Sequence, residues 1–493
     1  MSDLVTTATQ GRPSSPRRPA RAVAPFASWP VFSIAGLVLA AHLVISIGKE
    51  YWLDEAYMLA LGRFHLDWGF ADQPPVVPLL AAAMDAVAPD SLFVLRLPAV
   101  LATVAAVPVA ALIARELGAD RRAQVFTALA QACALWITLS GHWLTPYTLE
   151  PLQWLLLVWL LVRWIRLRDD RQLLILGVTI GIAAQTKFQV LLLCAVLLVS
   201  VLLFGPRELL RRPKFWVGVG IALLIALPTL VWQAIHGWPQ LRMSEVVAAE
   251  ADVLSGGRSG VAFQLFGYAG IAGLVLLLYG LWLLFTDQRL RAYRFLGVTF
   301  VVLYVIFVVG AGRPYYLGGL YAVGFAVGAL GLQWRREAGR ARLRWLAWPA
   351  FGLSVAAAIG MLVLSTVFTS SPGMPVGERI AANTSTVYAE LPARQRERTA
   401  LLGESYVVAS YLDAYASRYE LPGSYSAHRG YGFFGPPPER VDAVVYVGDR
   451  PDRLRRYFGD VRAATDPGQD PKVWLATDRT VSWARIWPEL REL

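Results

Sequence analysis

Long apolar runs recur over the first three quarters of the chain and are separated by short polar segments. Several of these runs are near the roughly 20 residues that an α-helix needs to cross a bilayer. The pattern predicts an all-α membrane domain over residues 31–370, with about eleven spans. The expected spans are residues 31–48, 92–114, 123–141, 148–167, 172–185, 188–204, 215–235, 262–285, 295–311, 317–333 and 345–368.

The chain after residue 370 has a different pattern, because it is polar and lacks long apolar runs. Short β-like pieces alternate there with helix-like pieces, which predicts a small α/β soluble domain over residues 371–493. Its segment 425–438 is rich in Tyr, Phe, Gly and Pro, and we expect an exposed loop within reach of the membrane domain. The β-like pieces are Ala400–Leu402, Ala443–Val447 and Val473–Ala476, and the helix-like pieces are Tyr406–Tyr419 and Asp452–Phe458.

Composition agrees with a membrane protein. Apolar residues make up 56% of the 493 residues and charged residues 16%, with a mean hydropathy of +0.47, which is too apolar for a soluble domain. Residues 1–30, rich in Arg, Pro, Ser and Ala, are expected to be a disordered cytoplasmic tail before an uncleaved first span. Cys133 and Cys194 lie in apolar runs, which favours packing over a disulfide or a metal site.

The net charge of +11 would suit a nucleic-acid partner, but the Lys and Arg residues are concentrated in the loops on one side of the membrane. If the N-terminus is cytoplasmic, the loops on that side carry 23 Lys and Arg residues, and the loops on the other side carry 7. This imbalance indicates orientation under the positive-inside rule. The sequence therefore predicts a multi-pass membrane protein whose C-terminal domain faces outside, and it argues against a nucleic-acid partner.

The first outer loop, residues 49–91, is long and contains an acidic pair. Asp54 and Glu55 follow the first span closely, and the turn Asp72-Gln73-Pro74-Pro75 divides two expected interfacial helices at about 54–66 and 75–88. Ionisable groups at the membrane surface are functional candidates. The structural alternative is a solvated helix cap, because acidic residues favour the first turn of a helix.

Other outer loops carry further polar and aromatic candidates. The long loop at 236–261 contains Glu245, Glu250 and Asp252. Aromatic residues at an interface usually form a belt, and basic residues at helix ends usually extend to the surface. Basic residues are scarce on this side, however, so acids and bases facing one outer pocket suit an anionic lipid headgroup. Together with Tyr57 and Gln73 of the first outer loop, the candidates are His142, Trp143, Tyr147, Glu150, Lys187, Arg313, Tyr315 and Tyr316.

Five segments together carry a resemblance to a known family. They are Leu53 to Tyr57, Gln73 to Pro75, the turn at Lys187, Trp232 to Pro239, and Arg313 to Leu317. The chain resembles the membrane-embedded glycosyltransferases of the GT-C fold that use lipid phosphosugars. This group contains protein O-mannosyltransferases and the aminoarabinose transferase of lipid A, and the nearest match is the bacterial family 39-like branch. The resemblance covers about residues 30 to 335. Gln73 departs from a frequent His, and Glu150 from a common Asp.

The resemblance implies an inverting glycosyltransferase on the outer face of the bacterial cytoplasmic membrane. The donor would be a sugar on a polyprenyl monophosphate, and the acceptor a hydroxyl of a lipid, a glycan or a protein. Asp54 would be the general base, and Glu55 would orient it. No cofactor is implied, and a divalent metal is left open. Lys187 and Arg313 would stabilise the leaving phosphate, with Tyr315, Tyr316, Glu150, Tyr57, His142 and Gln73 as further substrate contacts.

Two other classes of function use the same features. A polyprenyl-lipid transporter or flippase would bind the same anionic lipid without chemistry, although such transporters often contain internal repeats. A non-catalytic scaffold for envelope assembly would act through its outer domain, and Asp54 would be dispensable. The long outer loop and the soluble domain favour an enzyme.

Overall fold

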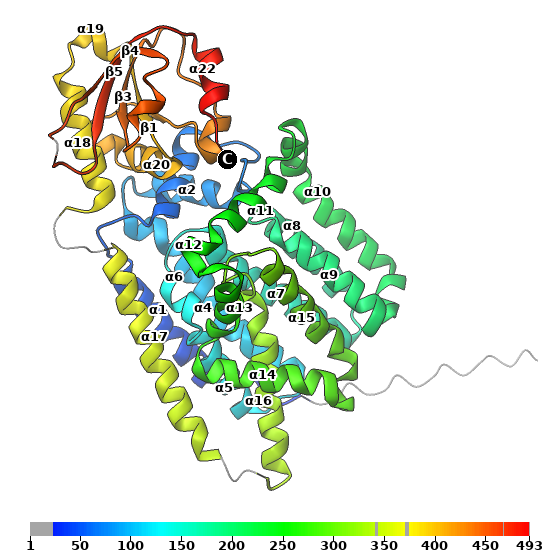
Figure 1. The fold of residues 1–493 in the computed structure, drawn as a ribbon. Helices are drawn as coiled ribbons and strands as arrows, with labels where there is room; N and C mark the ends of the chain where they lie inside the picture. Colours follow the sequence, from blue (N-terminus) through cyan, green and yellow to red (C-terminus); the bar gives the residue numbers. More distant parts are fainter. Residues whose placement is uncertain (1–22, 341–343, 370–373, 467, 493) are drawn as a thin grey trace, which may run out of the picture.

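The computed structural model describes residues 23–340, 344–369, 374–466 and 468–492, arranged as a helical part and an α/β domain above it (Figure 1). Most of the expected N-terminal tail lies outside the described residues. The first helix begins at Ser28, inside the range expected for that tail. The helical part extends to Thr369, and the α/β domain begins with a helix at Val376.

The helical part contains long apolar helices joined by short connections. Its α-helices are α1 (Ser28–Ile45), α2 (Leu53–Phe64), α3 (Val76–Val87), α4 (Leu92–Glu116), α5 (Arg121–Ala132), α6 (Leu135–Ser140), α7 (Pro146–Leu167), α8 (Arg171–Ala184), α9 (Gln189–Phe204), α10 (Pro213–Ile235), α11 (Pro239–Ala249), α12 (Ala251–Ser255), α13 (Gly257–Gly267), α14 (Ile271–Thr286), α15 (Arg294–Val309), α16 (Tyr321–Glu337) and α17 (Ala347–Thr369). Short 3₁₀ helices precede α10, α15, α16 and α17.

The expected count of eleven spans is not confirmed. Within the described ranges, six helices are long and apolar enough to cross a membrane, or seven if the bent pair α13 and α14 forms one span. The expected span at 123–141 is broken after Ala132, and α13 and α14 meet at 93°. The two breaks contact each other, because the Leu135 N–H donates to the Tyr268 carbonyl at 2.9 Å. Gly270, at φ +79°, lies so close that a Cβ there would be 2.7 Å from the Cys133 carbonyl oxygen.

Helix packing separates a protein core from a lipid-facing surface. The core lies among α4, α7, α14 and α16, whose buried side chains form one cluster. Small residues permit the closest approach: a Cβ on Gly280 of α14 would lie 2.1 Å from the Gly324 carbonyl oxygen of α16. By contrast, α1, α10 and α17 expose most of their apolar side chains. This distribution is that of a multi-pass membrane protein.

The C-terminal domain is built on a five-stranded sheet with the order β2-β1-β3-β5-β4. Strands β2, β1 and β3 are parallel, and β5 pairs antiparallel with β3 and β4. Helices cover the sheet, as Figure 1 shows. The strands are β1 (Thr399–Gly403), β2 (Ser424–Tyr425), β3 (Ala443–Val447), β4 (Phe458–Ala463) and β5 (Val473–Arg479), and the helices are α18 (Val376–Glu390), α19 (Ala393–Arg396), α20 (Tyr406–Ala414), α21 (Ala416–Tyr419) and α22 (Trp483–Leu490).

The predicted α/β character of this domain is confirmed, with one wrong element. Three strands and the helical segment at 406–419 occur where the sequence predicts them. The expected helix Asp452–Phe458 is absent: only the 3₁₀ turn η6 (Pro451–Arg453) forms, and Phe458 already begins β4. Pairing with β5 outweighs the local helical preference of a charged run, since tertiary context overrides propensity.

The C-terminal domain packs on the first loop of the helical part. Helix α20 lies against α2, and their apolar side chains belong to one buried cluster. Arg63 of α2 pairs with Asp85 at 2.6 Å and donates to the Ala414 carbonyl at 2.9 Å. The Glu50 carboxylate accepts from the Gly377 N–H and the Tyr415 hydroxyl, both at 3.2 Å. These contacts make α2 the base on which the domain sits. The two helices expected in this loop are present, as α2 and α3.

Burial of Glu50 at this junction predicts a pH-dependent stability. Burial raises the pKa of Glu50 to about 7 from an ordinary 4.5. The folded state then holds the proton more tightly than the unfolded state, so this stabilisation is present below pH 4.5 and is lost as the pH rises through 7. We expect the melting temperature in detergent to fall more between pH 5 and pH 8 for the wild type than for Glu50→Gln. The exposed Glu245→Gln variant is the control, and equal slopes for all three proteins would contradict the assignment.

Candidate functional site

The first turn of α2 is fixed by a buried carboxylate. Glu55 accepts from the Trp52 backbone N–H at 3.0 Å, which caps the helix. It also pairs with Arg96 of α4 at 2.7 Å, and both side chains are fully buried. Its other oxygen accepts from the Leu144 N–H at 3.0 Å. Glu55 therefore joins the start of α2 to α4 and to the turn between α6 and α7.

Asp54, the preceding residue, lies in a different environment. Its side chain is mostly buried, and its Oδ2 accepts from the Tyr147 hydroxyl at 3.1 Å. The Tyr147 oxygen in turn accepts from the Trp52 indole N–H at 2.8 Å. Burial raises the pKa of Asp54, against the Tyr147 hydrogen bond and the positive charges of Arg429 and Arg313. A carboxylate in such surroundings is a stronger base than an ordinary Asp.

Aromatic rings lie beside Asp54. Tyr315, in the loop between α15 and α16, stacks on Trp136 of α6 with 4.4 Å between the ring centroids. The same ring lies 5.0 Å from the ring of Tyr147. Trp52 stacks on Trp143 at 4.2 Å. The loop that carries Arg313 is thereby placed next to the start of α2.

Lys187 lies in the turn between α8 and α9 and contacts three other predicted site residues. Its ammonium group donates to Glu150 at 2.8 Å. It lies 4.4 Å from the ring centroid of Tyr316 and 5.4 Å from that of Tyr315. The structure thus brings together Glu150, Lys187, Tyr315 and Tyr316, which come from three separate parts of the chain.

Arg313 contacts a residue that the sequence analysis does not assign to the site. Its guanidinium pairs with Glu250, in the turn between α11 and α12. Glu250 pairs also with Arg429, at the start of the 3₁₀ helix η5 (Arg429–Phe433) of the C-terminal domain. Burial on its own would raise the pKa of Glu250, but the two guanidinium groups lower it below its ordinary value.

Three predicted contacts do not join this group. The ring of His142 lies 5.6 Å from that of His42 and hydrogen-bonds Ser365 of α17 at 3.3 Å, because the turn after α6 directs it toward α1 and α17. Tyr57 is buried and donates to Asp72 at 2.8 Å. The half-buried Gln73 accepts from the Phe70 N–H through its carbonyl.

Two further residues near these positions have only weak signals in the sequence. Arg96 is an apparently isolated base within an apolar run, and its buried partner Glu55 is 41 residues away. Arg429 belongs to the segment expected to be an exposed loop. That loop does contact the helical part, but Tyr431 within it is 2% exposed and packs near Tyr57 and His65. The part of the chain that the structure describes contains no group of three or more His, Cys, Asp or Glu residues placed to hold a metal ion.

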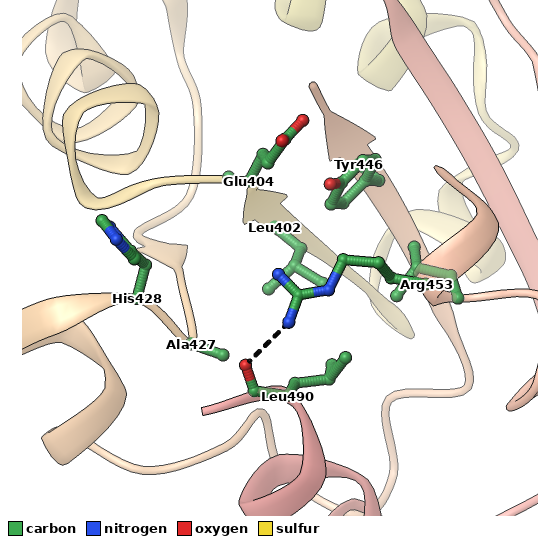
Figure 2. A pocket seen from close by; sticks show the side chains of 9 residues that line it. Leu402, Glu404, Ala427, His428, Tyr446, Arg453 and Leu490 are labelled. Carbon is green, nitrogen blue, oxygen red and sulfur yellow. Dashed lines mark hydrogen bonds between the residues drawn. The ribbon is translucent and has the colours of Figure 1, made fainter. Parts of the chain in front are cut away.

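Clefts lie at two places, beside these residues and in the C-terminal domain. One lies among α4, α6 and α7 and is lined by Thr103, Ser140 and Tyr147. The other lies in the C-terminal domain at the ends of β1 and β3. Figure 2 shows Glu404, Tyr446 and Arg453 around this second cleft, with Arg453 donating to the Leu490 carbonyl. None of the predicted site residues lines it.

The fold and part of the sequence match known glycosyltransferases. A family model described as dolichyl-phosphate-mannose-protein mannosyltransferase matches residues 72–232. ArnT from Cupriavidus metallidurans, solved in the apo state and bound to undecaprenyl phosphate, superimposes with a TM-score of 0.62 at 15% identity. That match covers 90% of this chain and 97% of ArnT. No curated protein matches the chain by sequence.

Two more distant structures share the architecture. The Archaeoglobus fulgidus oligosaccharyltransferase, solved with zinc and sulfate, matches at 13% identity with a TM-score of 0.53, over 90% of this chain and 72% of that one. The mycobacterial arabinofuranosyltransferase AftD matches at 14% identity with a TM-score of 0.53, over 93% of this chain and 40% of that one. The GT-C fold implied by the sequence resemblance is therefore confirmed.

The buried pair Glu55–Arg96 generates a stability prediction. Arg96→Met leaves the Glu55 carboxylate buried without its partner, and loss of one member of a buried pair typically costs about 3–5 kcal/mol. We expect a large fall in the melting temperature in detergent. The double variant Glu55→Gln/Arg96→Met removes both charges and should recover much of the loss. Arg242→Met, at an exposed position of α11, is the control. A melting temperature for Arg96→Met equal to that of the control would show that the pair does not hold the site.

Proposed function

We propose that this protein is an inverting glycosyltransferase that moves a sugar from a polyprenyl monophosphate to an acceptor hydroxyl. One observation carries the proposal. The basic carboxylate Asp54 and the cations Lys187 and Arg313 lie around one cluster of aromatic side chains, which includes Tyr147 and Tyr315. The match to a family model of lipid-phosphosugar transferases and the GT-C fold support it.

Asp54 acts as the general base in this proposal. The acceptor oxygen attacks the anomeric carbon of the donor sugar, and its proton passes to the Asp54 carboxylate. The bond between the anomeric carbon and the phosphate oxygen breaks on the opposite face, and its electron pair leaves with the lipid phosphate. A single displacement of this kind inverts the anomeric centre. Tyr147, which donates to Asp54 Oδ2, holds the carboxylate in place.

The cations stabilise the charge that develops on the leaving phosphate. Lys187 and Arg313 project from separate loops, and each pairs with a carboxylate, Glu150 and Glu250 respectively. Fixed cations at a developing negative charge lower the barrier without reorganisation. The hydroxyls of Tyr315 and Tyr316 lie in the same loop as Arg313 and are suited to donate to phosphate oxygens.

The site and the C-terminal domain face the outside of the cytoplasmic membrane. The loops that carry Asp54, Lys187 and Arg313 lie at the helix ends that contain few basic residues, and the basic loops lie at the other ends. This distribution supports the orientation under the positive-inside rule. A donor in the outer leaflet would then reach the site laterally.

Replacement of Asp54 tests the base. Asp54→Asn keeps the shape and the Tyr147 contact but removes the basicity, and we expect turnover to fall by at least ~10²-fold. Because burial raises the pKa of Asp54, wild-type kcat/KM should increase with pH through a pKa above the ordinary Asp value, and this limb should vanish in the variant. Turnover of a polyprenyl-phosphosugar in detergent is the measurement. Asp252→Asn, at an exposed position of α12, is the control, and near-normal turnover of Asp54→Asn would remove Asp54 from the reaction.

Cysteine accessibility tests the orientation. In a variant that lacks Cys133 and Cys194, a cysteine replacing the exposed Asp452 of the C-terminal domain should react with an impermeant maleimide in intact cells. A cysteine replacing the exposed Arg121 at the start of α5 should react only after lysis. The reverse pattern would place the site in the cytoplasm.

A further inference from the structure

Within the described ranges, Arg429 is the one residue of the C-terminal domain that shares an ion-pair partner with Arg313. Its guanidinium binds Glu250 and lies 4.8 Å from the ring centroid of Tyr406. The side chain is only 13% exposed. Against the effect of burial, its positive charge lowers the pKa of Asp54 and that of Asp72, both of which lie in the first outer loop. A base from the outer domain thus lies near the first outer loop.

The backbone holds Arg429 firmly over α2. Arg429 has φ +51°, a left-handed conformation that costs energy for a residue with a side chain, and its N–H donates to the Glu492 carbonyl at 2.7 Å. The next residue is Gly430, where a Cβ would lie 2.0 Å from the Tyr57 hydroxyl. Tyr57 and Asp54 are three residues apart on α2 and share a face. The turn therefore sits on the face of α2 that carries Asp54.

Glu250 lies between two arginines that come from different domains. One carboxylate oxygen binds Arg313 and the other binds Arg429. One negative charge thus opposes two positive charges. The Nη1 of Arg313 and the Nε of Arg429 are buried and have no hydrogen-bond partner among the described residues. Two guanidinium groups with donors to spare suit an anion that has more acceptor oxygens and more charge than a carboxylate.

We propose that Arg429 is a substrate-binding residue that binds the lipid phosphate together with Arg313, and that Glu250 and the phosphate compete for the two arginines. This inference rests on the proposed function and adds the outer domain to the site. On binding, the phosphate replaces Glu250 between the arginines. After transfer, the product is a phosphate monoester with a charge of about −1.5 to −2, and the return of Glu250 to both arginines assists its release.

Direct binding of polyprenyl monophosphate to the full-length protein in detergent tests this inference without requiring turnover. We expect Arg429→Met to weaken binding at least tenfold, and Arg429→Lys to recover part of that loss because it restores the charge. Glu250→Gln should tighten binding severalfold and slow dissociation, because the internal competitor has lost its charge. Arg450→Met is the matched control, since Arg450 belongs to the same domain and pairs with Glu404 away from the site.

The outcomes separate this inference from the proposed function. If Arg429→Met binds polyprenyl monophosphate with an affinity within twofold of that of the wild type, the inference is overturned and the transferase proposal stays intact. Weaker binding by Glu250→Gln, with an unchanged melting temperature, would also overturn it, because Glu250 would then support the site instead of competing for it. Binding that depends on Arg429, in a protein that transfers no sugar, would uphold the inference and defeat the transferase proposal. A wild type that does not bind polyprenyl monophosphate would defeat both.

Discussion

A pair of opposite charges, Glu55 and Arg96, is buried where the first outer loop meets α4, and the rest of the site depends on it. Burying either charge alone would be costly, so each fixes the position of the other. Glu55 also caps α2 and holds the backbone of the turn before α7. Because Asp54 precedes Glu55 and Tyr147 follows that turn, one buried pair sets the distance between the proposed base and the hydroxyl that orients it.

Carboxylates also neutralise the cations of the candidate site. Lys187 contacts Glu150, and Arg313 and Arg429 share Glu250. Positive charges close together in a low-dielectric site repel one another, and the carboxylates offset that repulsion. These cations and their carboxylate partners come from loops that are distant in sequence, and Arg429 belongs to the outer domain. Docking of that domain on α2 is in this account a condition for substrate binding.

The sequence predicts the parts of this protein that depend on local patterns. Apolar runs locate the helices, and the alternation after residue 370 locates β1, β3 and β5. Local patterns do not predict where a helix breaks: the interruption after Ala132 lies where the α13–α14 bend packs against it. They also place Asp452–Phe458 in a helix, although pairing with β5 makes its end a strand.

The candidate site likewise contains residues that the sequence predicts and residues that it does not. Asp54, Lys187, Arg313 and the two tyrosines stand out in sequence because charged and aromatic residues are scarce at those helix ends, and the structure brings them together. Long-range partners carry no such signal. His142 looks equally conspicuous, yet its turn directs it to His42, while Arg429 emerges only when a loop 116 residues beyond Arg313 is placed beside Glu250.

The decisive measurement is release of polyprenyl phosphate from a labelled polyprenyl-phosphosugar by the purified protein in lipid vesicles with an acceptor present. We expect the wild type to release polyprenyl phosphate as labelled sugar appears on the acceptor, and Asp54→Asn to release almost none. Movement of the intact donor across the vesicle membrane without cleavage would instead identify a lipid transporter and exclude a transferase.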